Sequence, residues 1–174
     1  MNINKMIEQA KNNLLSDDWD VQLKASSVLS ENCTKEIFDF LIALLESKDH
    51  GIKNIVALTL RDIGDSNAVD PLMVAICYKE NFNFNGTLVY ALQTLDCSQK
   101  LKELFEIMFY QGYEPALMAS MILDEQVFEF TKQNILDILV EWEDIKINNE
   151  KCPMYEDKKE MIQRDIDGFA SYLQ

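Results

Sequence analysis

Apolar residues recur along the chain at three- and four-residue spacings, the pattern of one face of an α-helix. The clearest example is residues 50–76, whose first half carries an apolar face made of Ile52, Ile55, Val56, Leu60 and Ile63. Gly64 then favours a left-handed helix end, and Asp65 and Ser66 supply capping oxygens. Pro71 suits the first turn of a second helix, where no N–H is needed. This stretch predicts a helical hairpin.

The hairpin pattern repeats about every 31 residues. Ile52 aligns with Val21, Phe84 and Pro115 at offsets of 31, 32 and 31 residues. The same offsets align three further apolar columns, which are Leu29, Leu60, Leu92 and Leu123, then Leu41, Leu72, Leu104 and Ile135, and then Leu44, Ala75, Ile107 and Ile138. A single hairpin cannot bury both of its apolar faces, so neighbouring hairpins are expected to stack.

The second unit resembles the short HEAT-like repeat found in phycobilin lyases and many bacterial scaffolds. The residues that carry the resemblance are Ile52-Lys53, Val56, Leu60, Ile63-Gly64-Asp65, Ala68-Val69 and Pro71-Leu72. The resemblance covers roughly residues 18–141, and the other copies depart from it mainly at the turns, where they have Glu31-Asn32-Cys33, Asp96-Cys97-Ser98 and Asp124-Glu125. It implies binding of partners across a surface and no particular chemistry.

The predicted fold is therefore all-α, a right-handed α-solenoid of about four HEAT-like helical hairpins with a capping helix at each end. We expect one domain over residues 1–174. Residues 1–15 form the N-terminal cap, residues 18–147 the four repeats and residues 154–173 the C-terminal cap.

Three details of the repeats are also predicted. The helices of the first hairpin span about residues 20–30 and 35–47, and a long helix spans about residues 126–147. Phe82 and Phe84 are expected to insert into the core of the third hairpin. In the fourth hairpin, the core face is expected to be Leu117, Met118, Met121 and Ile122.

Composition agrees with a helical protein that has a continuous core. The 174 residues are 48% hydrophobic, with only five Gly and three Pro. The N-terminus does not resemble a secretion signal, and no apolar run is long enough to span a membrane. Four scattered cysteines are expected to be buried thiols without disulfides. These features together predict a cytoplasmic protein.

The net charge narrows the class of partner. The chain carries 16 Lys and Arg against 30 Asp and Glu, a formal charge of −14. This disfavours direct binding of nucleic acid and favours a basic protein partner, although acidity can also serve solubility alone. Residues 114–150 hold nine acidic residues and two lysines, so half of the excess charge lies there.

No pattern of catalytic residues is present in the sequence. His50 is the only histidine and is predicted to be a polar turn residue, which leaves no plausible zinc ligand set. Neither a phosphate-binding Gly-rich loop nor a Gly-x-Ser-x-Gly elbow occurs. We therefore predict a non-enzymatic protein with no cofactor and no metal.

The candidate partner-binding residues come mainly from the second helix of each hairpin, which lines the concave side in HEAT-like folds. Two aromatic side chains are expected to act as anchors among the carboxylates. The full set is Asp39, Asp70, Glu103, Glu106, Tyr110, Asp137, Glu141, Trp142 and Asp144.

A compact acidic HEAT-like protein is also similar to immunity proteins that neutralise bacterial nuclease toxins. This resemblance implies an inhibitor that occludes the active site of a basic toxin. Two alternatives remain open. One is a structural adaptor that binds a peptide or helix in its groove, and the other is an enzyme of the lyase type.

Overall fold

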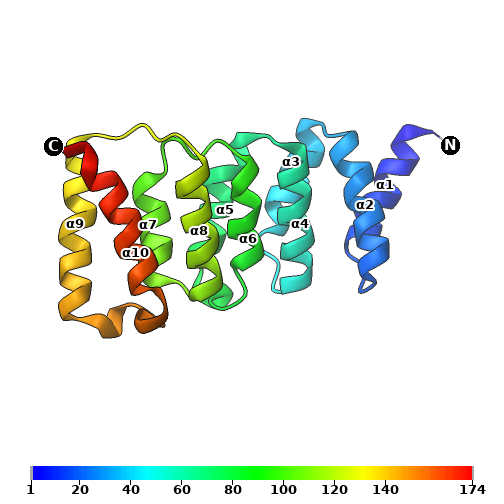
Figure 1. Cartoon of the computed structure of the whole chain (residues 1–174). Helices are drawn as coiled ribbons and strands as arrows, with labels where there is room; N and C mark the ends of the chain where they lie inside the picture. The colour runs from blue at the N-terminus through cyan, green and yellow to red at the C-terminus, as the bar shows by residue number, and fades with distance from the viewer. Residues whose placement is uncertain (1, 174) are drawn as a thin grey trace. The chain divides into compact units, whose positions relative to one another are not determined.

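The computed structural model describes residues 2–173, which contain ten α-helices, five short 3-10 helices and no strand (Figure 1). The fold is all-α and of the α-solenoid type, as predicted. Contacts divide the chain into two compact units, Met1–Leu95 and Asp96–Gln174. The boundary falls at the turn of the third predicted hairpin. The single-domain assignment stays a prediction.

Unit 1 contains two layers of helices. Its α-helices are α1 (Ile3–Leu14), α2 (Trp19–Glu31), α3 (Lys35–Leu44), α4 (His50–Ile63), α5 (Val69–Cys77) and α6 (Gly86–Ala91). Helices α2, α4 and α6 pack side by side, and α3 and α5 pack behind α4 and α6 (Figure 1). Met1, the first residue of the predicted cap helix, lies outside the described residues.

Short polar residues fix where these helices begin and end. The side chains of Asp18, Thr34 and Asp49 accept backbone N–H groups at the starts of α2, α3 and α4. Gly64 ends α4 in the left-handed conformation, with φ of 72°. Pro71 lies in the first turn of α5, after a 3-10 turn at Ser66–Ala68. The hairpin predicted for residues 50–76 is confirmed.

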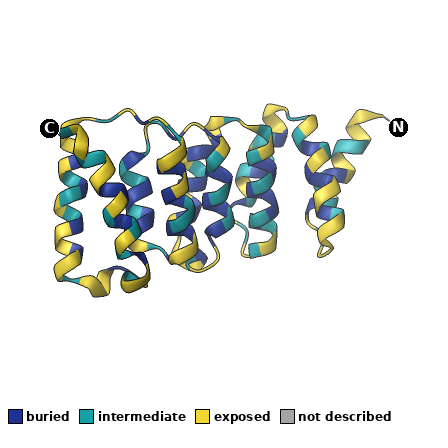
Figure 2. Ribbon diagram, viewed as in Figure 1, coloured by how far each residue is buried: buried dark blue, intermediate teal, exposed yellow. Residues whose placement is uncertain are grey.

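The aligned leucines occupy the core of their own units. Leu29, Leu60 and Leu92 are fully buried in unit 1, and Leu123 is buried in unit 2. Within each unit, buried residues lie mainly on the sides of the helices that face one another, and exposed residues lie mainly on the outer sides (Figure 2). Burial of these apolar faces is the main favourable contribution to folding.

Unit 2 is built from α7 (Leu101–Tyr110), α8 (Tyr113–Glu125), α9 (Lys132–Ile147) and α10 (Tyr155–Ala170). Helix α7 packs on α8 and α9, and α10 packs on α8. The rings of Phe109 and Trp142 stack at 5.8 Å in its core. The buried ammonium of Lys158 caps the C-terminal end of α7. It donates to the carbonyl oxygens of Met108 at 2.9 Å and Gln111 at 2.7 Å.

The long helix begins six residues later than predicted. Residues 126–131 precede α9 as an irregular segment, in which the N–H of Glu129 donates to the carbonyl oxygen of Ser98 at 2.9 Å. Thr131 and Asn134 then form a reciprocal capping box that starts α9. The other predicted helices differ by a few residues at their ends, with α3 ending at Leu44 and α10 at Ala170.

Several expectations about burial were wrong. Phe84 is 56% exposed, because the polar turn before α6 instead buries Asn81 and Asn85, whose side-chain amides donate to the backbone of α5. Helix α8 turns its small residues inward, so Leu117 and Met118 are only half-buried and Met121 is exposed, while Ile122 is buried as expected. Of the cysteines, Cys77 is exposed.

A matched pair on α2 tests the core. Leu29 is fully buried and Leu23 is 40% exposed. We expect Leu29→Ala to lower the free energy of unfolding by about 2–5 kcal/mol, through lost burial and the cavity left behind. Leu23→Ala should cost less than about 1 kcal/mol. Urea denaturation followed by circular dichroism measures both, and equal losses would contradict this account of the core.

Candidate protein-binding surface

Six of the predicted site residues come together on two packed helices of unit 2. Helices α7 and α9 contact each other, and each carries a stripe of polar residues at helical spacing. Helix α7 contributes Glu103, Glu106 and Tyr110, and α9 contributes Asp137, Glu141 and Asp144. We call this set of six residues the α7–α9 face. The Tyr110 hydroxyl joins the two stripes by donating to Glu141 Oε1 at 2.7 Å.

The α7–α9 face concentrates negative charge. Burial, and then the nearby charge of Glu141, raise the pKa of half-buried Glu106. The pKa of Tyr110 is also raised, first by burial and then by its hydrogen bond to Glu141 and the surrounding carboxylates. Tyr110 therefore remains a protonated donor. The repulsion within this cluster is relieved when a cation approaches.

Not every carboxylate of the face is equally available. Lys151 and Asn148 hold the pKa of Asp144 below its usual range, and Lys151 Nζ lies 2.6 Å from Asp144 Oδ2. Asp137 accepts a hydrogen bond from Gln133 at 2.8 Å. Such exposed contacts are weak and exchange easily with a partner's cations.

Trp142 is not a surface anchor. Its side chain is 1% exposed, stacks on Phe109, and donates through Nε1 to Gln163 Oε1 at 2.7 Å. In the sequence, Trp142 lies between two charged residues, Glu141 and Glu143, and this pattern favoured an exposed position for its side chain. Tyr110, at 37% exposure, is the aromatic residue that remains accessible on this surface.

The two remaining site residues belong to unit 1. Asp39 lies on α3 and forms an exposed ion pair with Lys35 at 2.7 Å. Asp70 lies exposed in the first turn of α5. Neither is part of the α7–α9 face.

Sequence reasoning missed Glu129. This exposed residue follows α8 in the irregular segment, and its Oε2 accepts from Gln99 Nε2 at 2.5 Å. It lines a cleft of about 490 Å³ together with Glu103 and Glu106. The Thr131–Asn134 capping box was the signal that would have placed Glu129 outside the helix.

Helix α9 also exposes apolar side chains next to its acidic stripe. Leu136, Val140 and Ile147 are 44%, 71% and 81% exposed. An apolar stripe beside a charged one is typical of a surface that packs against another protein.

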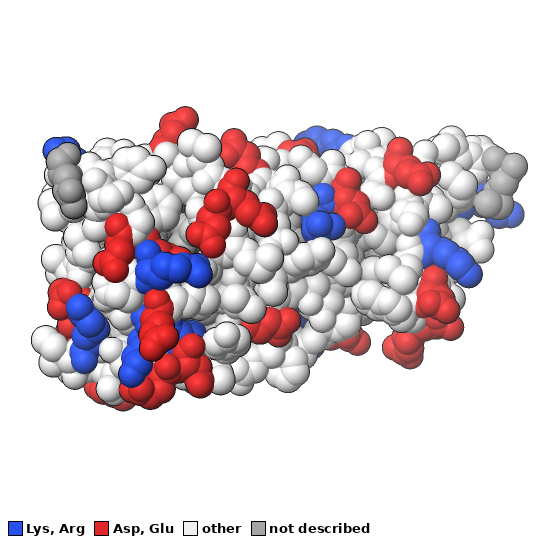
Figure 3. Space-filling model, in the orientation of Figure 1, with Lys and Arg blue, Asp and Glu red and all other residues white. Residues whose placement is uncertain are grey.

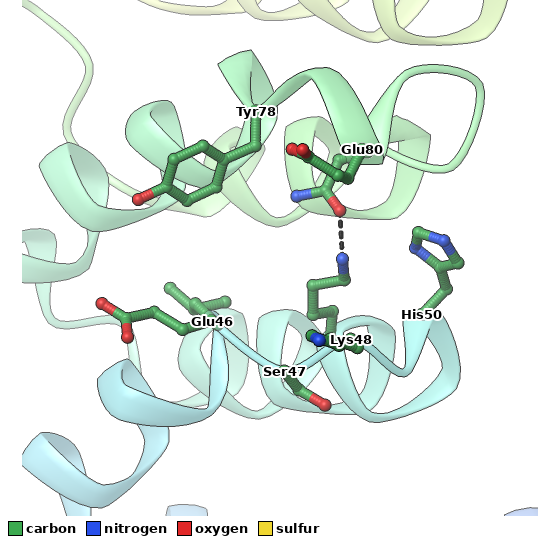
Figure 4. A pocket seen from close by; sticks show the side chains of 9 residues that line it. Glu46, Ser47, Lys48, His50, Tyr78 and Glu80 are labelled. Carbon is green, nitrogen blue, oxygen red and sulfur yellow. Dashed lines mark hydrogen bonds between the residues drawn. The ribbon is translucent and has the colours of Figure 1, made fainter.

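Another cavity, of about 580 Å³, lies in unit 1 between the turn before α4 and the turn after α5 (Figure 4). Buried Lys53 lines it and hydrogen-bonds to Asn81. His50, predicted as a turn residue, is the first residue of α4 and stacks on Phe84 at 4.2 Å. Lysines and carboxylates both line this cavity, so its lining carries charges of both signs.

The charge over α9 and α10 is mixed on the side shown in Figure 3, where basic groups lie among acidic ones. Ion pairs account for this, including Lys146 with Glu143 at 2.5 Å and Lys159 with Glu156 at 2.5 Å. Among residues 2–173, no group of three or more His, Cys, Asp or Glu is placed to hold a metal ion. None of the helices described has the length and apolar character needed to cross a membrane.

Comparison with known families agrees with the helical hairpins described above. A family model of HEAT repeats matches residues 3–93, more than half of the chain. The chain belongs to the HEAT-repeat family. The match includes α1, for which the sequence pattern predicts only a cap, and it ends before α7, whereas the resemblance in the sequence extends to about residue 141. HEAT repeats generally mediate protein–protein interactions, and the family is typically non-enzymatic. A search of curated proteins found no match.

The raised pKa of Glu106 predicts a stabilising substitution. A carboxyl group whose pKa is higher in the folded state supports folding at low pH and loses that contribution as pH rises through the folded pKa. Glu106→Gln removes the unfavourable charge, so we expect a higher Tm than the parent at pH 7. The gain should disappear near pH 4, where the parent side chain is protonated.

Glu143→Gln is the control, because Glu143 is exposed on α9 and paired with Lys146. It should leave Tm at pH 7 unchanged or slightly lower. Thermal melts at several pH values give the comparison. A Glu106→Gln protein that is less stable than the parent at pH 7 would contradict the assigned repulsion.

Proposed function

We propose that this protein is a non-enzymatic binding module whose α7–α9 face binds a basic protein. The observation that carries the proposal is the clustering of Glu106, Glu141 and the Tyr110 hydroxyl on two packed helices, with the pKa of Glu106 raised by burial and by Glu141. Unit 2 holds 17 acidic residues against eight Lys and Arg, so it carries nine of the 14 excess negative charges. Such a field speeds the approach of a basic partner.

In its most specific form, the proposal is that the partner is a nuclease-type toxin and that this chain is its immunity protein. An enzyme that cleaves nucleic acid needs a basic cleft to hold phosphates. An acidic protein that covers this cleft excludes the substrate and competes for the same cationic side chains. The net charge of −14 and the α7–α9 face support this form of the proposal.

The exposed apolar stripe of α9 favours a second candidate, a structural adaptor. Leu136, Val140 and Ile147 offer apolar contacts to an amphipathic helix or peptide. Binding of this kind depends on burial of apolar surface and responds little to salt. The salt dependence of association therefore separates the two candidates.

Two variants with the same change in charge test the binding face. One carries Glu103→Gln, Glu106→Gln and Glu141→Gln, and the control carries Glu31→Gln, Glu46→Gln and Asp62→Asn, all exposed positions of unit 1. A partner is first captured with the parent protein from its native source, and its association rate is then measured by surface plasmon resonance.

We expect the first variant to associate at least about tenfold more slowly than the parent, because steering by a charged surface is lost. The control should stay within about twofold of the parent. For the parent, raising salt from about 0.05 to 0.5 M should slow association, because the screening length falls to a few Å. A salt-independent rate, or equal effects of both variants, would reject the proposed face.

The proposal that the partner is a nuclease toxin is tested by a separate assay of nucleic-acid cleavage. If the captured basic protein cleaves nucleic acid, an equimolar amount of the parent chain should abolish cleavage, and the first variant should require a higher concentration. Undiminished cleavage in the saturated complex would exclude occlusion of the active site.

A further inference from the structure

A second pocket in unit 2 combines aromatic rings with carboxylates. It lies where α8 ends, between residues 126–130 and the C-terminal part of α10, and encloses about 630 Å³. We call it the aromatic pocket. Its aromatic and acidic lining consists of Phe128, Phe130, Phe169, Tyr172, Asp124 and Asp165.

Neighbouring rings in the pocket pack edge to face and are not stacked in parallel. Phe169 meets Phe128 and Phe130 at interplanar angles of 73° and 79°, and Phe130 meets Tyr172 at 74°, with centroids 5.5–5.9 Å apart. Phe130 is half-buried and Tyr172 is 66% exposed. The exposed aromatic surface at the pocket therefore belongs mainly to Tyr172 and in part to Phe130, and the face of an exposed ring attracts a cation.

Asp165 is a buried carboxylate that lines the pocket and pairs with Arg164 through one oxygen only. Its side chain is only 2% exposed, and burial raises its pKa, while Ser120 and Arg164 act in the opposite direction. Oδ1 accepts from Arg164 Nε at 2.7 Å, but Oδ2 is buried and has no hydrogen-bond partner among the described residues. A buried carboxylate oxygen without a donor is costly, so a donor that enters the pocket is favoured.

The pocket rim carries a second carboxylate. Asp124 is 64% exposed and lies 3.4 Å from the guanidinium of Arg164, which also holds Asp165. Two carboxylates thus share one arginine. The lining keeps a net negative charge beside the aromatic rings.

The irregular segment before α9 explains how this pocket arises beside the α7–α9 face. Gln126, Val127, Phe128 and Phe130 line the aromatic pocket, whereas Glu129 lines the cleft with Glu103 and Glu106. One partner segment can therefore meet acidic groups on both sides of residues 127–130.

We propose that the aromatic pocket binds a lysine side chain of the basic partner, an inference that rests on the proposed function. The apolar stem of lysine packs against Leu123, Val127 and the phenyl rings, and its ammonium lies beside the carboxylates of Asp124 and Asp165. Lysine suits the site better than arginine, because Arg164 already occupies the position in which a planar guanidinium pairs with Asp165.

The test uses n-butylammonium as the probe, because it reproduces the lysine side chain, and 1-butanol as its neutral counterpart. Both are titrated into the full chain and followed by the NMR amide signals of Gly168 and Tyr172. We expect saturable shifts with butylammonium at a Kd of about 1–10 mM, as befits a ligand of five heavy atoms. Butanol should bind at least about tenfold more weakly.

Substitutions identify the groups responsible. Asp165→Asn keeps the shape of the side chain and should weaken butylammonium about tenfold, and Tyr172→Leu, at an exposed position, should weaken it about threefold. Asp167→Asn is the matched control, since Asp167 is exposed on the same helix and does not line this pocket. It should leave the Kd within about twofold of the parent.

Three results would overturn the inference. Equal binding of butanol and butylammonium would show an apolar pocket, and equal effects of Asp165→Asn and Asp167→Asn would show nonspecific attraction. Tighter binding of tetramethylammonium than of butylammonium would assign the pocket to a quaternary ammonium ligand. Because the probe needs no partner, its binding tests the pocket even where the charge variants disprove the α7–α9 face.

Discussion

Burial of apolar faces between neighbouring helices is the interaction on which the rest of this protein depends. Each helix has one apolar side, and a lone hairpin leaves part of that surface in water. In unit 1, Leu29, Leu60 and Leu92 are buried between neighbouring helices and so take apolar surface out of water. In unit 2, Leu123 belongs to the buried face of α8. This burial must also offset the self-repulsion of a chain with a net charge of −14.

The same constraint decides which charges are buried. Lys158 is fully buried, and burial lowers its pKa, but its ammonium caps the carbonyl oxygens of Met108 and Gln111 at the end of α7. That position is favourable for a cation because the end of a helix is negative. Asp165 is the counterexample, since only one of its two oxygens has a partner. We therefore read Lys158 as structural and Asp165 as a group placed to meet a ligand.

Helix positions were predictable because periodicity and capping are local properties of the sequence. The hairpin over residues 50–76 followed from apolar spacing and capping residues, whereas the grouping of acidic residues on α7 and α9 was expected from the resemblance to HEAT-like repeats. Side-chain burial at the turns was not predictable, because it depends on hydrogen bonds between distant residues. Phe84 is exposed because asparagine amides fill the interior turn before α6, and Trp142 is buried because Phe109 on another helix offers it a stacking surface.

The irregular segment at residues 126–131 shows how a break between two helices places side chains around two cavities of unit 2. A helix continued through this segment would place Phe128, Glu129 and Phe130 about 100° apart around one axis. The hydrogen bond from the backbone N–H of Glu129 to the carbonyl oxygen of Ser98 holds the segment instead, with Glu129 at the acidic cleft and Phe128 and Phe130 at the aromatic pocket. The packed helices α8 and α9 flank this short stretch, and its irregular backbone directs the carboxylate of Glu129 and the two phenyl rings to different cavities.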